Sequence, residues 1–381
     1  MFDFKTMPLP RSTRREFLKR SGSGLGLLAL GQCLPSFLLP TSLGAGAVHT
    51  NGLPVLVVVR LTGGNDGLNT VIPYADDNYY RLRPTLAIDR AHVLPISETL
   101  GLHPACGKMQ ALFKSGKMTV VQNVGYPQPS RSHARATEIW ESGSNSNEVL
   151  STGWLGRYLD TLAGDAGVDH GPLGIHFTPE RPLALTASTE ARTVEWSASS
   201  LTQIGSHSTA KYPDGSFAHA LRHIVDSVAA KFPARVYFVS LNGFDTHSHQ
   251  ANQHQNLLQT LSEGLFAFQQ DLESQGIARQ VLTMTYSEFG RSPAENENRG
   301  TDHGTSAPLF LIGSALQGGM VGTPPTLDLA PSQQLVPSTD FRQVYATLLE
   351  DWLVCPAESV LGNQFAKLEL LNPITVHLPM P

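Results

Sequence analysis

The sequence predicts an α/β protein in which helices cover both faces of a mostly parallel sheet. Five runs of the 381-residue chain are continuously apolar and rich in β-branched residues, which is typical of strands buried on both faces. Segments with helical periodicity separate these runs, and such alternation favours a parallel sheet. The chain is 41% hydrophobic and only 15% charged, so it can bury the large core that this fold requires.

The predicted elements follow one another along the chain. The strands read LPVLVVVRL from Leu53, KMTVVQNVG from Lys117, ARVYFVSLNG from Ala234, RQVLTMTYS from Arg279 and APLFLIG from Ala307. The helices are expected at residues 104–115, 133–141, 153–163, 217–231, 254–274 and 338–353. In the last helix, Ser338 or Thr339 is expected to cap the first turn.

Residues 143–215 are rich in serine, threonine, glycine and proline. We expect them to form a loop-rich insertion that helps to complete a pocket. The sequence contains no repeat of fixed period, and residues 48–381 are expected to form one domain that carries this insertion.

The N-terminal segment has the features of an export signal. The run TRREFLKRSGSGLGLLALGQCLPSFLL joins the twin arginines Arg14 and Arg15 to a moderately apolar stretch. The small residues GAGA predict cleavage after Ala47, so residues 1–47 are expected to be a twin-arginine signal peptide. The alternative is an uncut anchor, but the apolar stretch is shorter than the ~20 residues of a spanning helix.

We therefore expect a periplasmic or secreted protein, with the twin-arginine translocase as its partner during export and no stable membrane span after cleavage. Removal of residues 1–47 would take away 6 of the 27 basic and 2 of the 32 acidic residues, and the net charge would change from −5 to −9. This charge argues against nucleic acid as a partner. Cys106 and Cys355 would remain in an oxidising compartment, where one disulfide is possible.

Residues with catalytic or metal-binding chemistry lie beside the ends of the predicted strands. Ligands of open parallel sheets collect beyond the carboxyl ends of the strands, where loops vary without disturbing the core. The residues in these loops, in strand order, are Asp66, then Ser130, Ser132 and His133, then Asp245, His247 and His249, then Glu288, and finally His303 before the last strand.

Carboxylates and imidazoles gathered at one edge of a sheet require a compensating charge, which a divalent metal ion supplies. Ligands of this kind without thiolate suit zinc, manganese, magnesium or iron, and calcium is a further candidate. Each residue also has a local alternative. Asp66 can form an Asx turn, His247 can cap a helix, and Glu288 can pair with Arg291.

Several motifs resemble those of an exported bacterial family known as domain of unknown function 1501. They extend over nearly all of the chain after the signal and read LTGGNDGLNT, SHARATEIWESG, FDTHSHQ, SEFGR, GTDHG and STDFRQVYATLLEDWL. That family is thought to belong with the alkaline phosphatase and sulfatase superfamily. The resemblance therefore implies a three-layer, alkaline phosphatase-like α/β/α sandwich with a two-metal site for the hydrolysis of phosphate or sulfate esters.

The resemblance also implies which residues bind metal. Asp66 matches the ligand that follows the first strand. Asp245, His303 and either His247 or His249 match the ligands of the other ion, and the motif DTH favours His247.

The segment TYSEFG departs from the superfamily pattern. Glu288 stands in the place of a metal-binding aspartate, and Phe289 stands in the place of a metal-binding histidine. The second ion would then be weakly held, absent, or completed by Asp302 or Asn69.

A serine at the start of a helix is the expected nucleophile. Ser132 opens a predicted helix, whose dipole and free N–H groups favour an anionic group there. A simple N-cap is the alternative role, and Ser130 is the alternative nucleophile. Arg131 or Arg291 is expected to pair with phosphate or sulfate oxygens.

The sequence thus predicts an exported metal-dependent hydrolase that acts on a small-molecule or glycan ester. A second hypothesis is an exported binding or assembly protein that retains the fold without the chemistry, and Phe289 is the residue that favours it.

Overall fold

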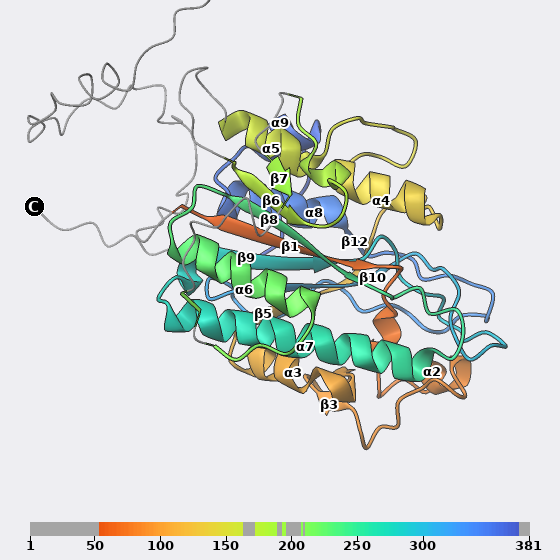
Figure 1. Cartoon of the computed structure of the whole chain (residues 1–381). Coiled ribbons are helices and arrows are strands. Elements are labelled where there is room, and N and C mark those ends of the chain that lie inside the picture. Colours follow the sequence, from red (N-terminus) through yellow and green to blue (C-terminus); the bar gives the residue numbers. More distant parts are fainter. Residues whose placement is uncertain (1–52, 163–171, 189–192, 196–206, 209, 373–381) are drawn as a thin grey trace, which may run out of the picture. The chain divides into compact units, whose positions relative to one another are not determined.

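The computed structural model describes residues 53–162, 172–188, 193–195, 207–208 and 210–372 (Figure 1). The chain divides into two units, residues 1–45 and 46–381, and every described residue lies in the second. The predicted signal peptide lies outside the described residues. Among the helices that are described, none is both long enough and apolar enough to cross a membrane.

A nine-stranded sheet forms the centre of the fold, with the order β11-β5-β10-β9-β1-β8-β6-β7 and with β12 paired to β5. Its strands are β1 (Val55–Thr62), β5 (Met118–Gly125), β6 (Gly174–Phe177), β7 (Thr193–Glu195), β8 (Val236–Asn242), β9 (Val281–Tyr286), β10 (Ala307–Ile312), β11 (Gly319–Val321) and β12 (Thr339–Asp340). All five strands predicted from the apolar runs are present.

One strand of this sheet runs against the others. β10 pairs antiparallel with both β5 and β9, whereas every other pairing in the sheet is parallel. The start of β10 therefore lies at the same edge as the carboxyl ends of β1, β5, β8 and β9. This places the loop that precedes β10 beside the loops that follow the parallel strands.

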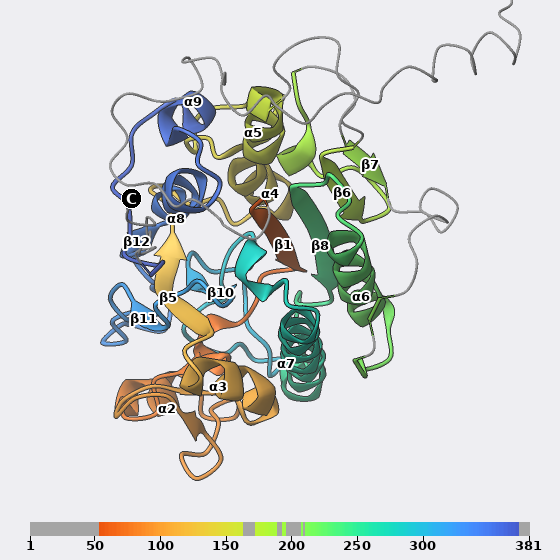
Figure 2. The same cartoon turned by 90° about the vertical axis from the view of Figure 1, so that its left-hand side faces the viewer.

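Helices cover both faces of the sheet, and Figure 2 shows the two layers on opposite sides of it. The helices of one layer are α4 (His133–Ser142), α5 (Trp154–Leu162), α8 (Phe341–Thr347) and α9 (Ala357–Leu361). The other layer contains α3 (Gly107–Lys114), α6 (Ser216–Ala229) and α7 (Gln250–Ser274). The predicted three-layer α/β/α sandwich with a mostly parallel sheet is confirmed.

Strand β1 shows why residues 55–59 are apolar without interruption. Leu56 and Val58 pack in the core on the side of α4, α5, α8 and α9, whereas Val57 and Val59 pack on the side of α3, α6 and α7. A strand between two helical layers has no face in contact with water, so the alternation typical of half-exposed strands is absent.

Several parts of the fold, among them the short strands β11 and β12, were not expected from the sequence. The described part of residues 143–215 contributes β6 and β7 to the main sheet, and the expectation of a loop-rich insertion missed these strands. Helix α2 (Asp77–Leu82) lies near a small sheet of β2 (Val71–Ile72), β4 (Gly101–Leu102) and β3 (Leu94–Pro95). These short elements lack a long apolar run or a helical period.

Two further expectations were wrong in detail. Helix α8 is capped by Asp340, which forms a capping box with Gln343, and neither Ser338 nor Thr339 is its N-cap. The carboxylate of an aspartate caps a helix as well as a hydroxyl does. In this structure Asp340, rather than Ser338 or Thr339, occupies the N-cap position. Cys106 and Cys355 are buried, and both are free thiols. They belong to the cores on opposite faces of the sheet, so they do not form the expected disulfide.

Candidate metal centre

Loops from distant parts of the sequence meet at the carboxyl edge of the sheet. Asp245 and His247 lie in the loop between β8 and α7, and His133 is the first residue of α4, after β5. His303 lies in the loop before β10, and the antiparallel direction of that strand brings it to this edge.

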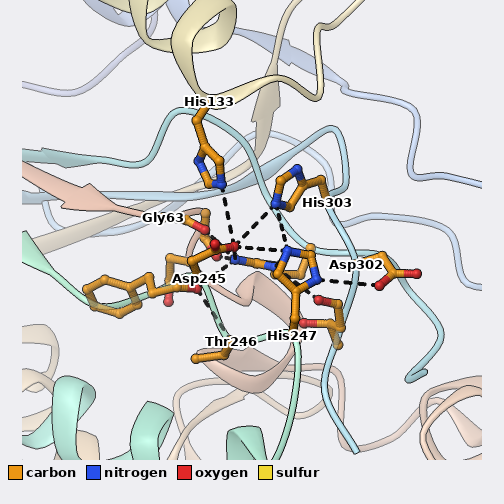
Figure 3. A network of polar contacts seen from close by, with 12 residues as sticks. Gly63, His133, Asp245, Thr246, His247, Asp302 and His303 are labelled. Atoms are coloured by element: carbon orange, nitrogen blue, oxygen red, sulfur yellow. Dashed lines mark hydrogen bonds and ion pairs between the residues drawn. The ribbon is translucent and has the colours of Figure 1, made fainter. Parts of the chain in front are cut away.

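The side chains of His133, Asp245 and His303 converge (Figure 3), and each offers a ligand atom within 4.8 Å of the other two. Oδ1 of Asp245 lies 3.4 Å from Nε2 of His133 and 3.2 Å from Nε2 of His303. His247 adds a third imidazole, whose Nε2 lies 3.1 Å from the same oxygen and 2.9 Å from Nε2 of His303. The arrangement therefore directs three Nε2 atoms towards one carboxylate.

Each of these imidazoles has an oxygen atom beside its other nitrogen. Nδ1 of His133 lies 2.8 Å from Oε1 of Glu288, and Nδ1 of His303 lies 2.8 Å from the carbonyl oxygen of Arg131. Nδ1 of His247 lies 3.5 Å from Oδ1 of Asp302. A carbonyl or carboxylate accepts a hydrogen bond, and for His133 and His303 the partner of Nδ1 is closer than Asp245 is to Nε2. For these two histidines the partners therefore favour a proton on Nδ1 and a free lone pair on Nε2.

Nε2 of His247 and Nε2 of His303 lie 2.9 Å apart. Two lone pairs at this distance repel unless a proton or a metal cation lies between them. Ligand atoms held 2.0–2.1 Å from a tetrahedral zinc ion lie about 3.3 Å apart, close to the separations around Asp245. Histidine ligands with an oxygen partner on the other nitrogen are the usual arrangement in metal sites. The residues present thus fit a divalent transition-metal ion.

A glycine allows the first strand to approach this loop. Gly63 follows β1 with a φ of +118°, and a Cβ atom there would lie 2.4 Å from the backbone nitrogen of Asp245. Glycine adopts this conformation without steric cost, and the missing side chain leaves room for the loop that carries Asp245.

Arg291 is buried directly beside Asp245. Its Nη2 atom donates to Oδ1 of Asp245 at 2.6 Å, and its side chain is 0% exposed. Partial burial of Asp245 disfavours its ionised form, but the hydrogen bond and the positive charge of Arg291, together with the contact with His303, outweigh this effect and lower its pKa to about 2. Asp245 is therefore an anion over the whole physiological pH range. Glu288, which the sequence offered as a partner of Arg291, pairs with His133 instead.

Asp66 lies away from this convergence, in a buried ion pair. Its Oδ2 atom accepts a hydrogen bond from Arg83 at 2.6 Å and another from Gln250, and the side chains of Asp66 and Arg83 are both 0% exposed. Burial raises the pKa of Asp66, but Arg83 outweighs burial, so the pKa lies below its usual value. Asn69 accepts a hydrogen bond from the same arginine.

Asp302 and His249 lie at the margin of the centre. Asp302 accepts a hydrogen bond from Asn296 and faces Nδ1 of His247 rather than the Nε2 atoms. His249 is exposed and is the N-cap residue of α7, with a φ of 48°, and its backbone donates to Asn298. Of the two histidines in the motif DTHSH, His247 is the one whose ring contacts Asp245 and His303.

The candidate nucleophiles precede His133. Ser132 is the exposed N-cap residue of α4, but its side chain makes no capping hydrogen bond. Oγ of Ser130 accepts a hydrogen bond from the backbone of Ser132 at 3.2 Å. Arg131 is exposed, and its carbonyl oxygen faces His303. The structure thus leaves the hydroxyl of Ser132 available for a role other than capping.

Phe289 lies against the centre, where the resemblance implies a histidine ligand. Its ring is buried, with its centroid 4.8 Å from that of His133 and 4.5 Å from that of His303. Phe289 therefore supports the two imidazoles by packing against them.

Sequence reasoning placed His133 among the polar residues after the second strand but did not recognise it as a ligand. The signal was weak, because a histidine at the start of an amphipathic helix also fits an ordinary surface position. Its ring reaches the centre because Glu288 and Phe289 hold it there.

Residues 202–360 match the model of DUF1501, a family described as proteins of unknown function. This match confirms the family resemblance that the motifs indicated within that segment. No curated protein matches the sequence.

Several solved structures are similar to the chain at low identity. The zinc complex of the C-terminal periplasmic domain of EcEptC from Escherichia coli is 11% identical, with a TM-score of 0.39 over 69% of this chain and 74% of that one. The lipoteichoic acid synthase LtaP from Listeria monocytogenes is 8% identical, with a TM-score of 0.40 over 81% and 76%. The soluble domain of lipooligosaccharide phosphoethanolamine transferase A from Neisseria meningitidis is 11% identical, with a TM-score of 0.39 over 71% and 79%.

Proposed function

We propose that this protein is an exported metal-dependent hydrolase of phosphate or sulfate esters. The observation that carries the proposal is the convergence of imidazole Nε2 atoms from His133, His247 and His303 on the carboxylate of Asp245. Three nitrogen donors and one carboxylate suit zinc, and manganese is the next candidate. Magnesium and calcium prefer sites made entirely of oxygen ligands, so they suit this centre less well.

A bound divalent ion would polarise a phosphoryl or sulfuryl oxygen of the substrate. The other requirements are a nucleophile and further positive charge. The hydroxyl of Ser132 lies at the N-terminus of α4, where the helix dipole favours an anionic group, and it is not used as a cap. Arg131 is exposed beside it, and its guanidinium would pair with ester oxygens.

Export through the twin-arginine translocase is part of the proposal. It is supported by the twin-arginine motif and the apolar stretch within residues 1–47. This route carries folded proteins, which suits a protein that takes up its metal ion before it crosses the membrane.

The function is tested by elemental analysis combined with an activity panel. Purified protein is assayed with chromogenic phosphate monoesters, phosphate diesters and sulfate esters in the presence of zinc, manganese, magnesium or calcium. We expect turnover with at least one ester, and we expect His303→Ala to lose both the metal ion and the activity. A metal content unchanged by His303→Ala would contradict the proposed centre.

The second candidate function is an exported binding or assembly protein without catalytic activity. The burial of Phe289 at the position where the resemblance implies a ligand favours it. Absence of turnover with every ester and metal, together with purified protein that contains no metal, would support this alternative.

A further inference from the structure

Arg291 places a fixed positive charge beside the proposed metal centre. A guanidinium remains protonated in proteins, and this one is held by several acceptors. Nε donates to the carbonyl of Gly64 at 2.8 Å, and Nη1 donates to that of Thr301 at 2.9 Å. Nη2 donates to the carbonyl of Phe244 at 2.9 Å and to Oδ1 of Asp245 at 2.6 Å. Only the last of these acceptors carries a formal charge, so Arg291 and Asp245 form a direct charge pair.

The carboxylates predicted to bind a second ion form ion pairs or hydrogen bonds with other residues. Asp66 is neutralised by Arg83 and accepts a further hydrogen bond from Gln250. Its Oδ1 atom is buried without a hydrogen-bond partner. Among the described residues, the one group of three potential ligand side chains is His133, Asp245 and His303, and Asp66 lies outside it.

Glu288 also has its partners within the protein. Its Oε1 atom accepts a hydrogen bond from the backbone of Gly63 at 2.8 Å and lies 2.8 Å from Nδ1 of His133. The side chain is only 1% exposed. Glu288 therefore supports a histidine ligand from behind and does not face the Nε2 atoms.

Asn69 and Asp302, the other residues predicted to complete a second ion site, also have partners within the protein. Oδ1 of Asn69 accepts hydrogen bonds from Arg83 and Tyr79, both at 2.8 Å. Asp302 accepts a hydrogen bond from Asn296 at 3.0 Å.

From these contacts we propose that the centre binds one divalent ion, and that Arg291 supplies the second positive charge beside Asp245. Two-metal hydrolases obtain this charge from a second ion that lies about 3.5–4 Å from the first. This inference rests on the proposed function and refines it, because it assigns an anionic ester to a site made of one ion and one buried guanidinium. Asp245 is the residue that connects the two charges.

The number of ions bound by the wild-type protein tests the inference. The metal-free protein is titrated with Co²⁺, which is followed by its visible absorption, and zinc-loaded protein is measured by elemental analysis after gel filtration. We expect one ion per chain in both experiments. Two ions per chain would overturn the inference and leave the proposed function standing. No bound ion would overturn the proposed function itself.

A pair of isosteric variants locates the ion. Asp245→Asn removes the carboxylate shared by the histidines and Arg291, and we expect it to lower the affinity for Co²⁺ at least tenfold. Asp66→Asn removes a carboxylate of the same kind from the buried pair with Arg83. We expect it to lower stability while one Co²⁺ still binds with the wild-type absorption spectrum. A change in the number of bound Co²⁺ ions or in their absorption spectrum in folded Asp66→Asn would overturn the inference. If that variant does not fold, the number of ions bound by the wild-type protein tests the inference alone.

Discussion

Oε1 of Glu288 lies 2.8 Å from Nδ1 of His133, so a buried carboxylate orients an imidazole whose other nitrogen faces Asp245. A carboxylate behind a histidine fixes its tautomer and makes Nε2 a stronger donor to a metal ion. Glu288 thus acts on the centre through His133, although its position after β9 made it a candidate ligand in the sequence.

The first prediction concerns the contact between Glu288 and His133. Glu288→Gln retains an oxygen that can accept hydrogen bonds from Gly63 and His133 but removes the negative charge. We expect the affinity for Co²⁺ to fall by about 10–100-fold, as is usual for changes to the partner of a metal-binding histidine. Titration monitored by visible absorption measures this effect.

A double-mutant cycle separates positioning from a general structural role. In a His133→Ala background, Glu288→Gln should cause little further loss of affinity, because the imidazole through which it acts is gone. An equal loss in both backgrounds would show that Glu288 acts independently of His133.

The second prediction distinguishes the two histidines of the DTHSH motif. His247→Asn should weaken Co²⁺ binding and change its absorption spectrum, because Nε2 of His247 lies 3.1 Å from Asp245. His249→Asn is the matched control. It lies in the same loop with a φ of 48°, a conformation that asparagine tolerates, so neither metal binding nor stability should change much. Loss of Co²⁺ binding in His249→Asn but not in His247→Asn would show that His249, rather than His247, is the ligand.

The third prediction concerns the nucleophile. Ser132 makes no capping hydrogen bond, so Ser132→Ala should change the free energy of unfolding by less than about 0.5 kcal/mol while it abolishes ester turnover. Ser130→Ala removes an acceptor from the backbone of Ser132 and should cost up to about 1 kcal/mol while turnover persists. Thermal unfolding and steady-state kinetics on both variants check this. Persistent activity in Ser132→Ala would exclude its hydroxyl as the nucleophile.

The fourth prediction concerns pH and two buried histidines away from the centre. Burial lowers the pKa of His103 and of His254 to about 4, despite the opposing effect of Asp66. In the unfolded chain both titrate near 6.5, so between pH 6.5 and 4 the unfolded state binds more protons. The stability that they contribute is complete above pH 6.5 and is lost as the pH falls towards 4.

Urea unfolding at several pH values measures this dependence. Each histidine should contribute a slope of up to about 1.4 kcal/mol per pH unit within the window. His254→Gln keeps a side-chain donor for Asn65, which lies 3.0 Å from Nε2 of His254, and it should remove the contribution of one histidine. A slope unchanged by this substitution would contradict the lowered pKa, because it would show that His254 binds protons equally in the folded and unfolded states.

The five predicted strands could be recognised because burial on both faces favours apolar residues at successive positions, as in residues 55–59 of β1. The direction of β10 could not be predicted, because a strand buried on both faces is apolar whether its pairing is parallel or antiparallel. This direction matters for the centre, since it brings His303 to the edge where Asp245 lies.

The sequence also did not indicate which residues the carboxylates pair with. Asp66 and Glu288 occupy similar positions after neighbouring strands, yet Asp66 pairs with Arg83 and Glu288 faces His133. Arg83 follows the short helix α2, whose sequence gives no sign that its guanidinium is buried.

The sequence by itself determined five strands of the main sheet, most of the helices between them, and the set of imidazoles and carboxylates beside the strand ends. Apolar runs, helical periodicity and residue type are properties of local sequence. Only the tertiary structure decided which of these side chains meet. Pairing between distant segments sets which nitrogen of each histidine faces inwards and which carboxylate is neutralised by arginine. A metal ion recognises that arrangement of lone pairs, and it exists only when the chain is folded.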